Sequence, residues 1–83
     1  MWKYTVQVDG MMCGMCESHV NDAVRKALSV TKVTSNHGKK ETVIVSENEY
    51  DEQAIRDAIA PTGYDVGTIS KEPYKKKFFG LFG

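Results

Sequence analysis

The order of apolar and polar positions along the chain predicts first a strand and then a helix. Over residues 2–8 apolar and polar side chains alternate, as they do on a strand that buries one face. From residue 17 to residue 28 the apolar residues instead recur at helical spacing, as on a helix that buries one stripe. The stripe consists of Val20, Ala23, Val24, Ala27 and Leu28. A half-buried strand followed by an amphipathic helix is therefore expected.

A pair of strands is predicted in the middle of the chain. Residues 30–36 have a weak strand pattern, and residues 42–46 are rich in β-branched side chains. Residues 37–40 are typical of a turn, in which Gly38 is free to adopt positive φ. The two strands are expected to pair as a hairpin. His37 is expected to be solvent-exposed in this turn, far from the sulfur-rich loop described below.

A second helix and a last strand are predicted after the hairpin. Asp51 is the expected N-cap, because its side chain can accept a hydrogen bond from the first helical turn. Pro61 is expected to disfavour helical geometry at Ala60, and Gly63 to end the turn that follows. Residues 64–70 have the pattern of a final strand.

The resulting order, βαββαβ, predicts an α+β fold. Two βαβ halves with short connections suit a ferredoxin-like sandwich, in which two helices cover one face of a four-stranded antiparallel sheet. We expect one domain over residues 1–70. Residues 71–83 lie beyond the last element that this fold needs and are expected to form a separate basic and aromatic tail.

Size and charge narrow the classes of function. The 83 residues suffice for one domain with a modest core. Eleven basic and 11 acidic residues give zero net charge, so charge offers no reason to expect nucleic acid as a partner. No secretory signal pattern and no apolar run of about 20 residues is present. A cytoplasmic location is therefore expected.

The chemistry of the chain is concentrated in a sulfur-rich loop after the first strand. Its two cysteines, Cys13 and Cys16, are three positions apart, so a disulfide between them would constrain almost nothing. In a reducing compartment this spacing is typical of metal ligands or redox catalysts. Cys16 is expected in the first helical turn and Cys13 on the preceding loop. Gly14 is expected to let that loop bend back.

Two thiolates in this position favour a soft cation such as copper(I). Amide groups and the dipole at a helix N-terminus stabilise the negative charge that a thiolate ligand needs. Two protein ligands leave the ion under-coordinated, so that it can accept a sulfur from a partner and leave by ligand exchange. No serine–histidine–acid constellation and no phosphate-binding glycine loop is evident, so the protein is not expected to be an enzyme.

The loop sequence resembles that of a known family. It has the form Gly-Met-x-Cys-x-x-Cys and consists of Gly10, Met11, Cys13 and Cys16. With the βαββαβ order and the Gly63-Tyr64 turn, it resembles the heavy-metal-associated domain of copper chaperones and copper-transporting P-type ATPases, over about residues 2–70. The resemblance implies a copper(I) site at the two cysteines, and docking onto a copper-transporting P-type ATPase or a copper-responsive regulator.

Four further residues in or near the loop, and one on the helix, are expected to support the two cysteines or to act as extra ligands. The resemblance implies that Met11 points into the core. It also implies that Tyr64 lies near the site and adjusts the properties of the thiolate ligands without binding the ion. Met12 and Met15 add thioethers, expected to be exposed, at positions where the family commonly has other residues, and either could touch the ion transiently as an extra ligand. His19 is expected to be a solvated surface residue, or else a third ligand or a nearby charge.

Three alternatives remain at this stage. A small thiol–disulfide oxidoreductase also places Cys-x-x-Cys at a helix start, although neither Pro61 nor Pro73 is well placed to face the dithiol. Silver and mercury(II) are as soft as copper(I). Zinc usually has four ligands in a structural site, so a zinc site would need two chains that share one ion. The protein is otherwise expected to be a monomer.

The end of the chain suggests a further contact. Lys75-Lys76-Lys77 precedes three phenylalanines, namely Phe78, Phe79 and Phe82. Residues 75–82 could therefore contact an anionic membrane surface weakly, cover an apolar patch, or extend freely into solvent.

Overall fold

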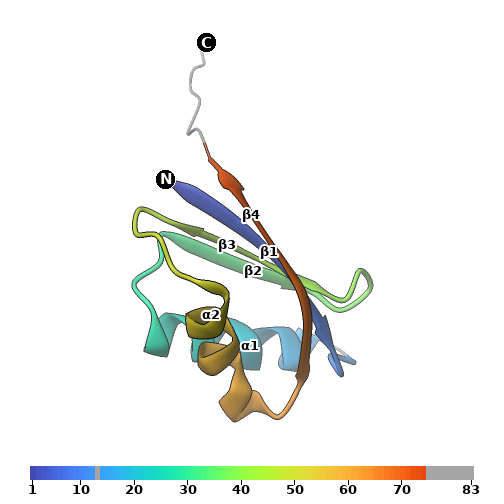
Figure 1. Cartoon of the computed structure of the whole chain (residues 1–83). Helices are drawn as coiled ribbons and strands as arrows, with labels where there is room; N and C mark the ends of the chain where they lie inside the picture. The colour runs from blue at the N-terminus through green and yellow to red at the C-terminus, as the bar shows by residue number, and fades with distance from the viewer. Residues whose placement is uncertain (13, 75–83) are drawn as a thin grey trace.

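The computed structural model describes residues 1–12 and 14–74. Its elements are β1 (Trp2–Asp9), α1 (Gly14–Ala27), β2 (Lys32–Asn36), β3 (Glu41–Ser46), α2 (Glu52–Ile59), a short 3₁₀ turn η1 (Ala60–Thr62) and β4 (Asp65–Pro73). The predicted order βαββαβ is confirmed. Figure 1 shows both helices on one face of the sheet.

Over the described residues, the strands form one antiparallel sheet in the order β2-β3-β1-β4. This is the ferredoxin-like arrangement. Tyr4 of β1 lies opposite Ile44 of β3, which in turn lies opposite Val33 of β2. Since side chains on paired positions share a face, this register gathers the apolar side chains of three strands beneath the helices.

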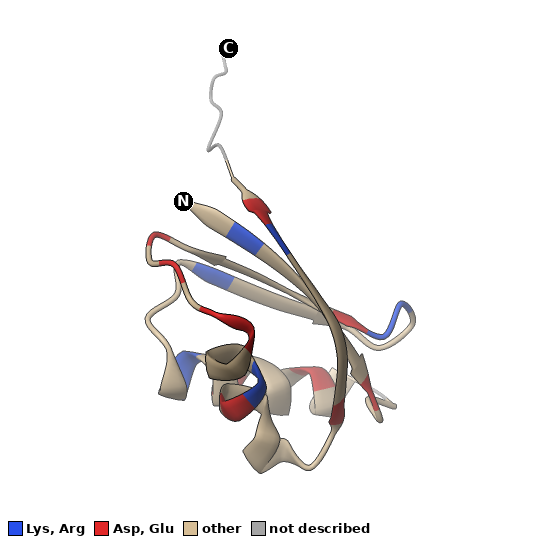
Figure 2. Cartoon of the chain, viewed as in Figure 1, with Lys and Arg blue, Asp and Glu red and all other residues tan. Residues whose placement is uncertain are grey.

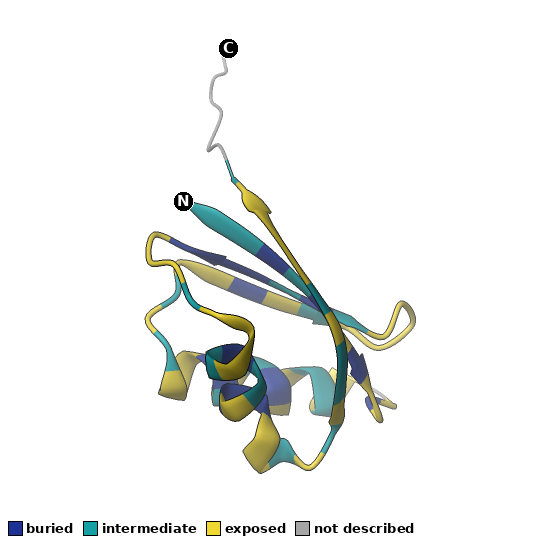
Figure 3. Ribbon diagram, in the orientation of Figure 1, coloured by how far each residue is buried: buried dark blue, intermediate teal, exposed yellow. Residues whose placement is uncertain are grey.

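The core lies between the sheet and the two helices (Figure 3). Its fully buried side chains include Val6 and Val8 of β1, Val20 and Val24 of α1, and Ile55 and Ile59 of α2. Burying a valine or isoleucine side chain fully contributes about 1.5–3 kcal/mol. The helix stripes predicted from spacing are thus the surfaces that hold the helices on the sheet.

The structure confirms the predicted start of α2 and contradicts one prediction about its end. The carboxylate of Asp51 accepts a hydrogen bond of 2.8 Å from the N–H of Ala54, as predicted for an N-cap. The prediction for Ala60 is wrong, because that residue is helical, with φ −49° and ψ −41°. Pro61 stands early in the 3₁₀ turn, where a missing N–H costs no hydrogen bond. Gly63 then ends the turn with φ +81°.

β4 runs to Pro73, three residues beyond the predicted end of the last strand. Pro73 lies opposite Trp2, and the N–H of Tyr74 donates to the carbonyl of Met1 over 2.9 Å. The ammonium of Lys71 lies 4.6 Å from the centre of the Trp2 ring and forms an ion pair with Glu49. Residues 71–73 therefore belong to the sheet. The membrane contact suggested for residues 75–82 lies outside the described residues.

None of the helices in the described part of the chain has the length and apolar character needed to cross a membrane.

A buried hydroxyl connects the middle of the sheet to the start of α2. Tyr4 is only 1% exposed, and its hydroxyl accepts a hydrogen bond of 2.6 Å from the N–H of Tyr50. Tyr50 in turn uses its own hydroxyl at the surface, where it accepts from the N–H of Ser29 over 2.9 Å. The two tyrosines thus hold the β3–α2 connection against the core from inside and outside.

Replacing Tyr4 by Phe is expected to destabilise the fold by about 1–3 kcal/mol, since it leaves the N–H of Tyr50 without its partner in a partly buried place. Tyr50→Phe is the matched control and should cost less, because the Ser29 N–H at the surface can turn to water. Urea unfolding of both variants measures the difference. An equal or larger loss in Tyr50→Phe would contradict this assignment.

Candidate metal centre

The candidate site lies where β1 gives way to α1, at the end of the molecule opposite the N-terminus (Figure 1). β1 ends at Asp9, and Gly10 follows with φ +111°, a conformation that side-chain-bearing residues rarely adopt. A Cβ placed on Gly10 would lie 2.8 Å from the ring of Tyr64. Gly10 is therefore required here both by its backbone angle and by the close approach of the aromatic ring.

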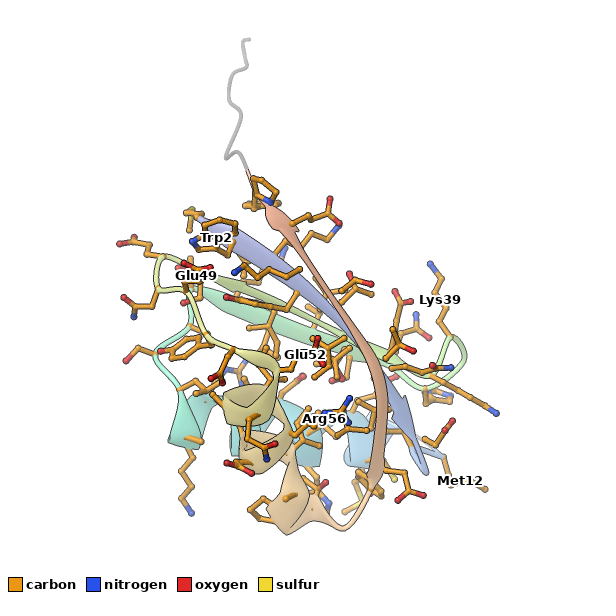
Figure 4. The ribbon with its side chains drawn as sticks, viewed as in Figure 1. Trp2, Met12, Lys39, Glu49, Glu52 and Arg56 are labelled. Carbon is orange, nitrogen blue, oxygen red and sulfur yellow. The ribbon has the colours of Figure 1, made fainter. Side chains whose placement is uncertain are left out.

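The three methionines of the loop and first turn lie in different surroundings. Met11 is 5% exposed and belongs to the core, whereas Met12 is 80% and Met15 is 72% exposed. Figure 4 shows Met12 at the far end of β1 from Trp2. The buried side chain of Met11 fixes the start of the loop on the core. The exposed pair are the only exposed large hydrophobic side chains among the described residues.

Cys16 lies in the first turn of α1, as predicted, and is half-buried against the edge of the core. The helix begins at Gly14, three residues earlier than predicted. The expected role of Gly14 is also different, because it is a helical residue without positive φ, and a Cβ placed on it would meet no atom within 4 Å. Cys13 lies outside the described residues.

The turn between β2 and β3 contacts the residue next to Cys16. His37 donates its backbone N–H to a carboxylate oxygen of Glu17 over 2.9 Å, and its ring Nδ1 lies 2.7 Å from the same oxygen. His37 is exposed, as predicted, but the expectation that it lies far from the loop is wrong. The sheet brings together two residues that are 20 positions apart, for which the sequence has no local signal.

The contact with His37 changes the acidity of Glu17. The N–H of His37, followed by its side chain, lowers the pKa of Glu17 below its ordinary value of 4.5 because both stabilise the carboxylate. The carboxylate also stands in the first turn of α1, where the helix dipole favours negative charge. Glu17 is therefore ionised at neutral pH and attaches α1 to the hairpin turn.

Carboxylates flank the loop on both sides. Asp9 precedes Gly10 and lies opposite Asp65 of β4, while Glu17 follows Cys16 (Figure 2). Two like charges in directly opposite positions on paired strands repel each other. The loop end of the molecule thus has three carboxylates, and Lys39 and Lys40 of the β2–β3 turn stand at the same end (Figure 2).

The remaining predicted residues lie around the same end. Tyr64 packs against the core as a half-buried ring, and its N–H donates to the hydroxyl of Thr62 over 3.2 Å. His19 is exposed on α1, where it lines an open groove between the two helices with Ala23 and Ala58. Within residues 1–12 and 14–74, no group of three or more histidine, cysteine or acidic side chains gathers in metal-binding geometry.

The family model of the heavy-metal-associated domain matches residues 5–65, well over half of the chain. The protein therefore belongs to the heavy-metal-associated domain family. A comparison with curated proteins finds no match.

Solved structures of similar fold include three with related descriptions. The crystal structure of a copper binding domain from HMA7, a P-type ATPase, is 26% identical with a TM-score of 0.76, covering 87% of this chain and 99% of the other. The CopZ metallochaperone is 29% identical with a TM-score of 0.69, covering 78% of this chain and 98% of the other. The yeast copper transporter domain CCC2A, solved in apo and Cu(I)-loaded states, is 26% identical with a TM-score of 0.70, covering 80% and 92%. Metal binding is thus the class of function that fold and family define.

Gly10→Ala is expected to destabilise the protein by about 1–3 kcal/mol, because alanine at this φ is strained and its methyl meets the Tyr64 ring. Gly14→Ala is the matched control. It should be neutral or stabilising by up to about 1 kcal/mol, since alanine is the better helix former and the space is open. Chemical unfolding of the reduced protein compares them; equal losses would show that neither feature of Gly10 matters.

Glu17→Gln is expected to lower the thermal midpoint at pH 7 but not at pH 2–3. The folded pKa of Glu17 is below its unfolded value, so its stabilising contribution is present above about pH 4.5 and disappears as the pH falls through the lowered pKa. Thermal unfolding at the two pH values measures this. Glu47→Gln, far from His37, is the control, and an equal loss in both variants at pH 7 would argue against the contact.

Proposed function

We propose that the protein is a cytoplasmic carrier of copper(I), which Cys13 and Cys16 bind as thiolates and release to a partner by ligand exchange. The main support is the match of the heavy-metal-associated domain over residues 5–65, which span both cysteines of the Cys-x-x-Cys motif. Two similar structures described with copper support copper as the ion, and a third is described with both Cu(I) and Zn(II). Copper is the cargo in this proposal, and the protein catalyses no reaction.

The surroundings of Cys16 suit an anionic sulfur. The first N–H groups of α1 have no carbonyl partners within the helix, and they stabilise a thiolate in the first turn. The half-buried position against the core restricts the rotamers of the side chain, so its sulfur is held in place before the ion arrives. Gly10 and Met11 fix the course of the chain directly before Cys13 in the sequence. In this proposal the Tyr64 ring packs against Gly10 and adjusts the properties of the thiolate ligands without binding the ion.

Release depends on the ion remaining accessible. Two thiolates leave a copper(I) ion able to accept a third sulfur, and attack by a partner thiolate followed by departure of Cys13 or Cys16 moves the ion without free copper in solution. Met12, being exposed beside the loop, is a thioether that can touch the ion during this exchange. The proposed acceptor is the thiolate-bearing domain of a copper-transporting P-type ATPase or a copper-responsive regulator. The carrier acts as a monomer, and a dimer forms only where one ion bridges two chains.

Anaerobic titration of the reduced protein with copper(I) against a chromophoric competing chelator tests the proposal. One equivalent should bind per chain, and Cys13→Ser or Cys16→Ser should weaken binding by at least a hundredfold. Ser18→Ala, an exposed position two residues after Cys16, is the control and should bind as the wild type does. Absence of tight binding, or turnover of a disulfide substrate without metal, would instead support a thiol–disulfide oxidoreductase.

A further inference from the structure

Two exposed side chains with soft or borderline donor atoms stand one turn apart on α1. Met15 and His19 are four residues apart within the helix, and both are exposed. Residues at this spacing lie on the same helix face with Cβ atoms about 5–6 Å apart. A thioether and an imidazole in such positions can bind one ion between them from two rotatable side chains.

The donors of this pair are available for a ligand. His37 uses its Nδ1 in the contact with Glu17, whereas His19 makes no hydrogen bond or ion pair within the described part of the chain. Met15 is 72% exposed, so its sulfur gains nothing from packing in the core. The donor atoms of both side chains are therefore open to a ligand.

The pair lies on the helix face next to that of Cys16. Cys16 is four residues before Val20, which is fully buried, and it packs on the edge of the core. Met15 and His19 share an adjacent helical face that is exposed to solvent, and His19 borders the groove between α1 and α2. Because Met15 and His19 are exposed whereas Cys16 is half-buried on the core, we assign the pair an ion of its own.

We propose that Met15 and His19 form a second, weaker site for a soft monovalent cation, next to the thiolate pair. Thioether sulfur suits copper(I) and silver(I), and a neutral imidazole completes a two-coordinate environment for a d¹⁰ ion. Neither donor is anionic, so the site has a lower affinity than two thiolates and fills after them. Glu17 and Asp22, which lie in the same two turns, are engaged by His37 and Arg25 and take no part in this site.

This site goes beyond the proposed function, because it gives the carrier a second ion at high metal supply. It places an ion at the surface, one helical turn from Cys16 or less, where it can move to the thiolates when they become vacant. Its existence does not depend on the thiolate site, and the two can be tested separately.

Silver(I) is the probe, because it has the same d¹⁰ configuration as copper(I) and stays in one oxidation state in air. The protein labelled with ¹³C at its methionine methyl groups is titrated and followed by NMR. In the wild type the Met15 methyl and the His19 ring are expected to shift with the second equivalent. In Cys13→Ser/Cys16→Ser they should shift with the first. If only the thiolate site fails to bind, the Met15 and His19 signals will shift with the first equivalent in the wild type, as they do in the double-serine variant.

Met15→Leu and His19→Gln should each weaken this second binding at least tenfold, while Ser18→Ala, an exposed control on the same helix, should leave it unchanged. Leucine replaces methionine at similar volume without the sulfur donor, so the helix is preserved. The proposal is overturned if Met15→Leu binds the second equivalent like the wild type, or if Ser18→Ala weakens it equally. If the double-serine variant does not fold, the same substitutions are compared in the protein that keeps both cysteines, where binding of the second equivalent tests the site.

Discussion

The packing of the Tyr64 ring against Gly10 is the contact on which the geometry of the sulfur-rich loop depends. The chain must pass from a half-buried strand to the start of α1 within a few residues. Positive φ at Gly10 makes that change of direction, and the ring covers the place where any side chain would lie. Met11 then returns to the core and Met12 points to water, so burial alternates residue by residue through the loop.

The other connections at this end of the sheet reinforce the same region. The carboxylate of Glu17 holds the β2–β3 turn through His37, and the N–H of Val8 donates to the carbonyl of Lys40 over 2.8 Å. Three segments distant in sequence thus meet around the start of α1. Because they are held by the sheet and by direct hydrogen bonds, the binding region is supported by regular structure and does not depend on one loop alone.

Much of this fold can be predicted from residue patterns, and the exceptions have physical reasons. Alternation in β1 and the apolar stripes of both helices indicate buried faces, and Asp51 is a cap whose signal is local. The first residues of α1 escape prediction because Gly14 and Met15 are exposed and add nothing to the stripe. The end of β4 escapes it because Lys71 has the character of a tail residue, yet it lies over Trp2. The Glu17–His37 contact depends on sheet register and has no counterpart in local sequence.

The hydrogen bond from Tyr74 to Met1 joins the two ends of the described chain at the end of the sheet farthest from the sulfur-rich loop (Figure 1). A fluorophore or surface linkage introduced at Met1 would therefore be attached at the far end of the sheet from Cys16. The end of the molecule where α1 begins would stay accessible to an approaching macromolecule. Protein linked through Met1 is thus suited to binding measurements in which the tether must not obstruct the encounter.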